Sequence, residues 1–188
     1  MAGEAPQKID LLFDPHLTQN VLIIFGGTND LGGGHKSAAT AFGALTAYCR
    51  ARKAAHPWRI LVVTPPVAAY PRVYPPDFDA QMVQYDALIR RNWRSFADGI
   101  VDVGADFRLG APGAEYNPVY FTGDFTHLTD AGYLIVGQDA AAATLRPPVS
   151  PAAGAPTLTF NEKARKSSPF MGEMGQSPED SASSFLRR

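Results

Sequence analysis

Three short runs of the chain are apolar almost without interruption, and each is followed by residues that favour a turn or a bend. They cover residues 20–26 (NVLIIFG), 59–64 (RILVVT) and 99–103 (GIVDV). A run that is apolar at nearly every position, rather than at every second one, is typical of a strand covered on both faces. The pattern therefore predicts three strands of a parallel sheet.

Between and after these runs, apolar residues recur at the three- and four-residue spacing of a helix. We expect helices over residues 37–53, 79–96 and 130–145. Ser37 is a good N-cap for the first of these helices, and Asp130 is the expected N-cap of the last. The alternating order of strands and helices predicts a doubly wound α/β fold, in which ligands bind beyond the carboxyl ends of the strands.

The helical and strand patterns stop near Arg146. Residues 147–188 hold six prolines and seven of the nine serines of the chain, with little apolar periodicity. Such a segment buries too little apolar surface to offset the entropy of ordering it. We expect an α/β domain over residues 1–146 and a Pro/Ser-rich disordered tail over residues 147–188, in which residues 157–160 (TLTF) are a weak strand candidate.

Composition excludes several classes of protein. The chain of 188 residues is 45% hydrophobic and carries a formal net charge of −1, which argues against a general nucleic-acid binder. No apolar run approaches the roughly 20 residues of a membrane-spanning helix. The first ten residues lack the features of a signal peptide, so a cytoplasmic location is expected if Met1 is the native start. A single cysteine and the absence of an HExxH pattern predict no metal site.

The first candidate motif, Gly26-Gly27-Thr28-Asn29-Asp30, directly follows the first predicted strand. The glycine pair allows a sharp turn, and the Asn29 amide can donate to an anionic oxygen. Local chemistry alone favours an ordinary turn over a site at these residues. The following residues do not complete the phosphate-binding pattern GxxxxGK[ST], because Asp30 and His35 replace its two glycines. We therefore expect neither a nucleotide nor another cofactor.

The second candidate motif places Asp124 three residues before His127, just ahead of the last predicted helix. A carboxylate at this spacing can accept a hydrogen bond from the imidazole Nδ1–H, which orients the ring and stabilises its protonated form. The alternative interpretation is a histidine near a helix start, beside an aspartate that forms the turn.

In combination, a strand ending in GGTNDL and a later DFTHLTDAGY resemble the SGNH (GDSL-type) hydrolase family over approximately residues 8–146. Gly27, Asn29 and Asp30 match the third sequence block of that family, and Asp124 and His127 match the fifth. The resemblance implies a flavodoxin-like, three-layer α/β fold and acyl-ester hydrolysis through a serine acyl-enzyme. It further implies that Asn29 is an oxyanion-hole donor, that His127 is the general base, and that Asp124 supports His127.

The family's nucleophilic serine and second-block glycine have no visible counterpart here. About 20 residues precede the first predicted strand, and they contain no serine. Ser37 fits a helix cap, Ser95 a helix end, and Ser177 follows Gly175-Gln176 as a faint echo of the family's GDS block. A histidine–aspartate pair activates a nucleophile and does not replace it, although a histidine-activated water could support weak hydrolysis.

We therefore expect a truncated SGNH-type ester hydrolase that lacks its first strands and has little or no activity alone. Its substrate would be a small-molecule, glycan or lipid ester. The missing first strand would lie beside residues 20–26, and the edge left unpaired there could pair with another chain. The alternative is a non-catalytic binding or interaction module on a hydrolase fold.

Overall fold

The computed structural model describes residues 5–69 and 73–147, with side chains from Lys8 onward. These residues belong to a compact unit that spans Met1–Ala155. The predicted tail beyond Pro147, including the strand candidate at residues 157–160, lies outside the described residues.

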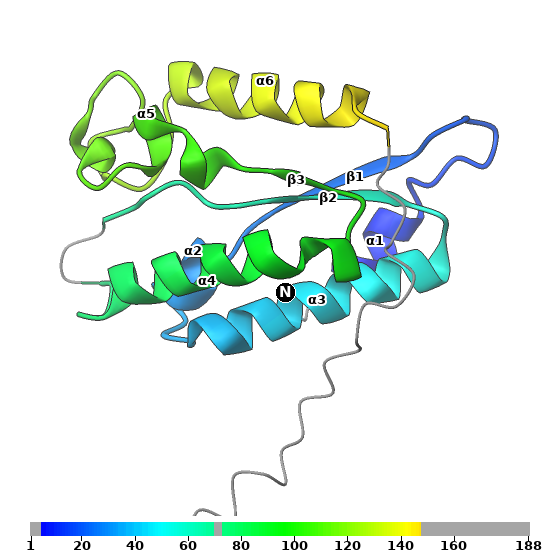
Figure 1. Cartoon of the computed structure of the whole chain (residues 1–188), viewed down its shortest axis with the longest axis horizontal. Helices are drawn as coiled ribbons and strands as arrows, with labels where there is room; N and C mark the ends of the chain where they lie inside the picture. Colours follow the sequence, from blue (N-terminus) through cyan, green and yellow to red (C-terminus); the bar gives the residue numbers. More distant parts are fainter. Residues whose placement is uncertain (1–4, 70–72, 148–188) are drawn as a thin grey trace, which may run out of the picture. The chain divides into compact units, whose positions relative to one another are not determined.

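The described strands form the parallel sheet that the apolar runs predict. β1 (Val21–Phe25), β2 (Arg59–Val63) and β3 (Gly99–Val101) lie in the order β1-β2-β3 (Figure 1). Val21 is in register with Arg59, and Leu61 with Gly99. β3 ends earlier than expected, because Val103 already begins a short 3-10 turn (Val103–Ala105).

The three predicted helices are present with small shifts at their ends. Ser37 caps the helix α3 (Ala38–Ala55), and its hydroxyl accepts from the Thr40 N–H. The expected cap of the last helix is wrong: Thr129 is extended and accepts from the Gly132 N–H, whereas Asp130 is the first helical residue. The helices are α1 (Ala5–Asp10), α2 (Thr28–Leu31), α3, α4 (Phe78–Asn92), α5 (Phe107–Gly110) and α6 (Asp130–Leu145), with 3-10 turns at Trp93–Ser95, Val103–Ala105 and Ala114–Tyr116.

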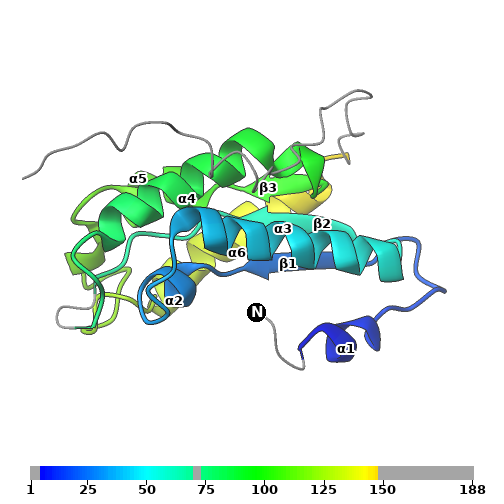
Figure 2. The ribbon, with the colours of Figure 1, turned by 90° about the horizontal axis from the view of Figure 1, so that it is seen from below.

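Helices cover both faces of the sheet, which gives the expected three layers. α3 and α4 lie on one face and α6 lies on the other (Figures 1 and 2). Ile60 and Val62 of β2 point into the core beneath α3 and α4, and Leu61 and Val63 point toward α6. All five β2 residues are buried, as a strand covered on both faces requires.

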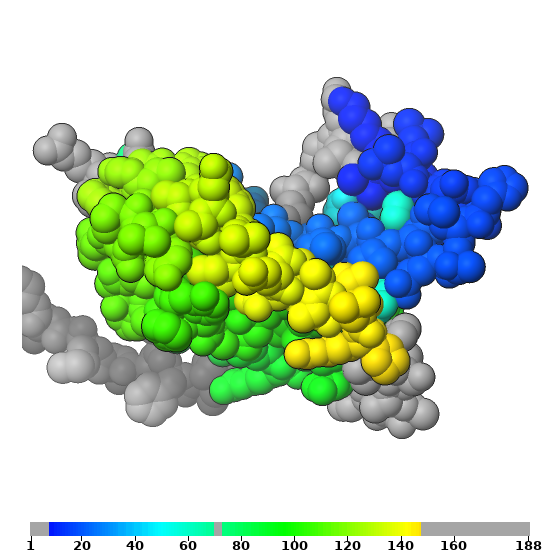
Figure 3. Space-filling view, turned by 90° about the horizontal axis from the view of Figure 1, so that it is seen from above, coloured from blue at the N-terminus to red at the C-terminus, as the bar shows by residue number. Residues whose placement is uncertain are grey.

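The expectation of two covered faces is wrong for β1. Ile23 and Phe25 are 44% and 42% exposed, on the face of the sheet that carries α6. In Figure 3, α6 (yellow) crosses one part of this face, and the blue segment beside it stays uncovered. A continuous apolar run shows that a strand has two apolar faces, but it cannot show that a helix covers each of them.

Arg59 fixes the far end of α6 to the start of β2. Its guanidinium is buried and donates to the carbonyls of Ala143 and Thr144, at 3.2 and 2.6 Å, and to that of Arg146. These carbonyls lack helical partners, and a cation is favourable at the negative end of the helix dipole. Arg59 is therefore both a strand residue and the C-terminal cap of α6.

A partly buried ionic network, of which only Asp86 is fully buried, joins α4 to the carboxyl ends of β2 and β3. The Arg90 Nε donates to both oxygens of Asp102, at 2.9 and 3.0 Å, and Arg90 Nη2 donates to Asp86 Oδ2 at 3.2 Å. The Thr64 hydroxyl donates to Asp102 Oδ1 at 2.8 Å. The other Asp86 oxygen is buried without a partner among the described residues, and burial raises the pKa of Asp86 to about 7.

The turn after β1 requires a glycine at position 27. Gly27 has a φ of 121°, a conformation that L side chains rarely adopt. A Cβ at this position would lie 2.4 Å from Tyr85 Cε1, because the Tyr85 ring packs directly beneath the turn. The Tyr85 hydroxyl also donates to the Gly26 carbonyl at 3.3 Å. The ring of a core residue in α4 therefore supports the backbone of the first candidate motif.

We expect the substitution Gly27→Ala to lower the free energy of unfolding by about 1–3 kcal/mol, from backbone strain and overpacking. Gly43→Ala is the matched control, since nothing lies within 4 Å of a Cβ there in α3. That change should raise stability by about 0.5–1 kcal/mol, through helix propensity. Urea unfolding of both variants measures the difference, and equal effects would contradict the role of Gly27.

Asp86 makes stability depend on pH. Its pKa is raised from 3.8 to about 7, so the folded state favours the protonated carboxyl group. The contribution of that group to the free energy of unfolding is therefore complete below pH 3.8 and is lost as pH rises through 7. The variant Asp86→Asn cannot ionise. We therefore expect the stability of the variant, measured relative to that of the natural chain, to be higher at pH 8 than at pH 5. Thermal unfolding at the two pH values tests this, and a constant difference would refute it.

Candidate active site

The loop that carries Asp124 and His127 is closed at its base by backbone pairing. Phe121 and Leu128 form an antiparallel bridge, and the Thr122 N–H donates to the His127 carbonyl at 2.8 Å. Within the loop, Phe125 has a φ of 60°, in the left-handed region that bulky residues avoid. This turn brings the chain back so that Asp124 faces the residues that follow it.

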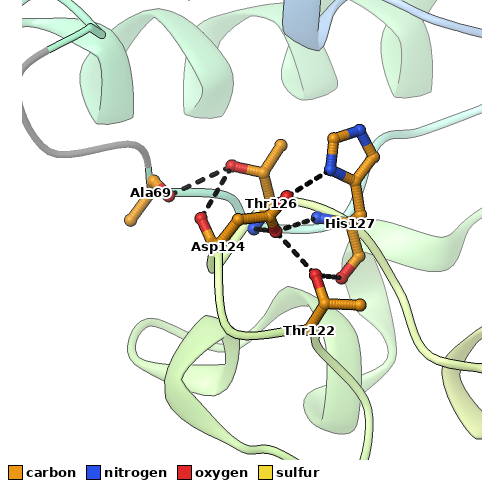
Figure 4. Close-up of polar contacts among 5 residues, drawn as sticks. All are labelled: Ala69, Thr122, Asp124, Thr126 and His127. Atoms are coloured by element: carbon orange, nitrogen blue, oxygen red, sulfur yellow. Dashed lines mark hydrogen bonds and ion pairs between the residues drawn. The ribbon is translucent and has the colours of Figure 1, made fainter.

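The Asp124 carboxylate organises this loop (Figure 4). Its Oδ1 accepts from the Thr126 N–H at 3.0 Å, the His127 N–H at 2.9 Å and the Thr122 hydroxyl at 2.7 Å. Its Oδ2 lies 2.5 Å from His127 Nδ1. The His127 backbone N–H, together with these other donors, holds the pKa of Asp124 well below its usual range. The carboxylate is therefore ionised and can only accept hydrogen bonds.

An acceptor-only partner determines which nitrogen of His127 carries the proton. The Nδ1 that faces Asp124 must be the protonated nitrogen, so the lone pair of a neutral ring lies on Nε2. The His127 side chain is 70% exposed, and the structure gives Nε2 no partner among the described residues. The ring can therefore accept a proton from, or bond to, a molecule that approaches from solvent.

The residues after β2 attach this loop to the sheet. The Ala69 N–H donates to the Phe125 carbonyl at 2.8 Å, and the Thr126 hydroxyl donates to the Ala69 carbonyl at 3.1 Å. Because residues 64–69 continue from the carboxyl end of β2, Asp124 and His127 lie beyond that end of the sheet. This is the position at which doubly wound sheets bind ligands.

The first candidate motif forms a helix start rather than an open turn. Thr28–Leu31 is the short helix α2, at the same end of the sheet as the Asp124 loop (Figure 1). Asn29 is exposed, and its side-chain amide has no hydrogen bond to the described residues. Asp30 is engaged in the loop itself, where its Oδ1 lies 2.7 Å from Lys36 Nζ and its carbonyl accepts from the Lys36 N–H.

The predicted site residues are thus brought together in part. Asp124 and His127 are in direct contact, whereas no hydrogen bond between described residues joins Asn29 to either of them. Thr122 and Ala69 were not predicted. Thr122 is a polar neighbour of Asp124 in the sequence and could have been proposed, but nothing in the sequence marks Ala69, which acts through its backbone from 55 residues before Asp124.

Ser37, Ser95 and Cys49 are not arranged as nucleophiles in the structure. Ser37 caps α3, and the Ser95 hydroxyl donates to the Asn92 carbonyl at 2.9 Å. Burial raises the pKa of the Cys49 thiol to about 12, so it is not a thiolate near neutral pH. Ser177 lies outside the described residues.

Residues 5–69 and 73–147 contain no cluster of three or more residues able to ligate a metal ion. Within the same ranges, no helix is long and apolar enough to cross a membrane.

Comparisons with solved structures give partial likenesses. A protein assigned as an arylesterase from Agrobacterium tumefaciens str. C58 has a TM-score of 0.49 and 21% identity, over 75% of this chain and 69% of that one. The native aryl esterase of M. smegmatis has a TM-score of 0.42 and 18% identity, over 73% and 66% of the two chains. No curated protein matches the sequence.

The sequence model of one family covers most of the chain. The GDSL-like Lipase/Acylhydrolase family matches residues 3–135, a span that includes both candidate motifs and the whole described sheet. The resemblance inferred from the GGTND and DFTH motifs is therefore confirmed: the chain belongs to the GDSL-like lipase/acylhydrolase, or SGNH-type, family of ester hydrolases.

Proposed function

We propose that this chain hydrolyses small carboxylic esters, with Asp124 and His127 as its proton-transfer pair. The observation that carries the proposal is the 2.5 Å contact between Asp124 Oδ2 and His127 Nδ1, beside a ring whose other nitrogen is open to solvent. The family of the chain supports ester hydrolysis as the class of reaction.

Each residue of the two motifs has a proposed role. His127 takes the proton of the attacking oxygen and returns it to the leaving alkoxide, and Asp124 keeps the ring in the productive tautomer. Asn29, which is exposed and free to reorient, donates to the oxyanion. Gly27 permits the turn that presents Asn29, and Asp30 holds the following loop through Lys36.

A second candidate function is a binding module that retains the site without turnover. It is favoured by one observation: within the described part of the chain, no hydroxyl group donates to the imidazole ring of His127. In that case the Asp124–His127 pair would bind an ester or a carboxylate and leave it unchanged.

We also propose that the outer edge of β1 pairs with a strand of a second copy of the chain. β2 occupies one edge of β1, and no described strand pairs with the other. β1 carries no charge or proline that would discourage such pairing, and Ile23 and Phe25 are partly exposed next to it.

We expect His127→Ala to lower the rate of p-nitrophenyl butyrate hydrolysis by about 100-fold or more, since general acid–base catalysis supplies that much. Asp124→Asn should also lower the rate, by removing the acceptor that fixes the tautomer. His16→Ala is the control, because His16 is exposed and its ring has no described carboxylate partner. Binding of the ester without any turnover in the natural chain would instead favour the binding module.

Pairing through β1 predicts a concentration-dependent dimer in light scattering coupled to gel filtration. Ile23→Lys should shift the chain toward the monomer, because a charge beside the edge opposes strand pairing. Val83→Lys is the matched control, since Val83 is 70% exposed on α4 and far along the chain from the edge. A mass unchanged by Ile23→Lys would exclude this edge as the interface.

A further inference from the structure

Helix α2 (Thr28–Leu31) lies between two tyrosine rings, and a glycine makes room for the ring at each end. At the amino end, the Tyr85 ring packs beneath Gly27. At the carboxyl end, a Cβ on Gly32 would lie within 2.8 Å of three atoms of the Tyr74 ring. Gly32 has a φ of −76°, outside the left-handed region that favours glycine. The Tyr74 ring, and not the sign of φ, therefore requires a glycine at this position.

We propose that Tyr74 is a positioning residue for ester hydrolysis: it fixes α2, and with it the point from which the Asn29 amide reaches the oxyanion. This inference rests on the proposed function, in which Asn29 is the oxyanion donor. It extends the site to a side chain that lies outside both candidate motifs.

Tyr74 is itself anchored to the core. Its ring packs on that of Phe78, with ring centroids 4.2 Å apart and ring planes inclined by 34°. Phe78 is the first residue of α4 and is buried in the core. Paired aromatic rings contribute more than their buried area alone. Tyr74 therefore connects α2 to the start of α4, as Tyr85 does from further along the same helix.

α2 depends on such contacts because it is too short to be stable alone. One turn of helix fixes several backbone dihedrals for very few hydrogen bonds. The Leu31 N–H donates to the Gly27 carbonyl at 2.9 Å, and the Asn29 carbonyl accepts from the Gly34 N–H at 2.8 Å. The Leu31 side chain is fully buried in the core that also contains Tyr85. One buried side chain and two ring–glycine contacts thus determine where Asn29 lies.

An oxyanion donor has to be placed more accurately than a group that only binds substrate. Its hydrogen bond is stronger in the transition state than in the ground state, so misplacement lowers kcat more than it raises KM. A displacement of about 1 Å can reduce the rate by roughly 100-fold. Loss of the Tyr74 ring should therefore appear in kcat.

The kinetic test compares variants of the full chain with p-nitrophenyl butyrate as substrate. We expect Tyr74→Ala to lower kcat by about tenfold with KM changed less than about twofold, and Tyr74→Phe, which keeps the ring, to retain the natural kcat. In the Asn29→Ala background, Tyr74→Ala should cause no further loss, because it acts through that amide. Val73→Ala is the matched control, since it truncates the neighbouring side chain, which is 44% exposed.

The structural test does not depend on activity. Hydrogen–deuterium exchange, followed by peptide mass spectrometry, measures the backbone amides of residues 28–34. We expect Tyr74→Ala to raise their exchange rate by about tenfold or more, as local opening of α2 becomes easier, while peptides from β2 keep their natural rate. Val73→Ala should leave both sets of peptides unchanged.

The outcomes separate this inference from the proposed function. Unchanged exchange over residues 28–34, an equal loss of kcat in Tyr74→Phe, or a further loss in the Asn29→Ala background would overturn the inference and leave ester hydrolysis standing. Hydrolysis unaffected by Asn29→Ala would overturn the role of Asn29, and the inference with it. A natural chain without turnover would overturn the proposed function, and the exchange measurement would then decide whether Tyr74 fixes α2.

Discussion

The candidate site depends on one carboxylate that is fully hydrogen-bonded. Asp124 accepts two backbone N–H groups, one hydroxyl and one imidazole N–H, all from residues within three positions of it. These bonds hold the left-handed turn at Phe125 and fix the orientation of the His127 ring. The shape of the loop and the orientation of the His127 ring thus have the same cause, so a single change at Asp124 would alter both.

The rest of the fold positions this loop relative to the sheet. The segment after β2 holds it through Ala69, and the network of Asp86, Arg90 and Asp102 holds the start of that segment through Thr64. Tyr85, on the same helix as Asp86, supports the turn at Gly27 from below. Helix α4 therefore supports both candidate motifs, although it contributes no residue to either of them.

Sequence patterns predicted the elements well and the long-range contacts poorly. The continuous apolar runs located β1, β2 and β3 because a buried parallel strand is apolar on both sides. The same rule failed at Ile23 and Phe25, since it cannot tell whether a helix covers each face. The Asp124–His127 contact was predictable because a spacing of three residues in a tight turn brings the two side chains together. The role of Ala69 was not, since it involves a backbone carbonyl without a sequence signature.

The Arg59 cap has a mechanical consequence for the site. α6 begins three residues after His127 and ends where Arg59 binds its last carbonyls, so a rod of roughly 24 Å joins the imidazole to the opposite end of the sheet. A rod fixed at its far end cannot slide along its axis. The position of His127 along the axis of α6 is therefore fixed from the opposite end of the sheet, by the Arg59 guanidinium at the amino end of β2.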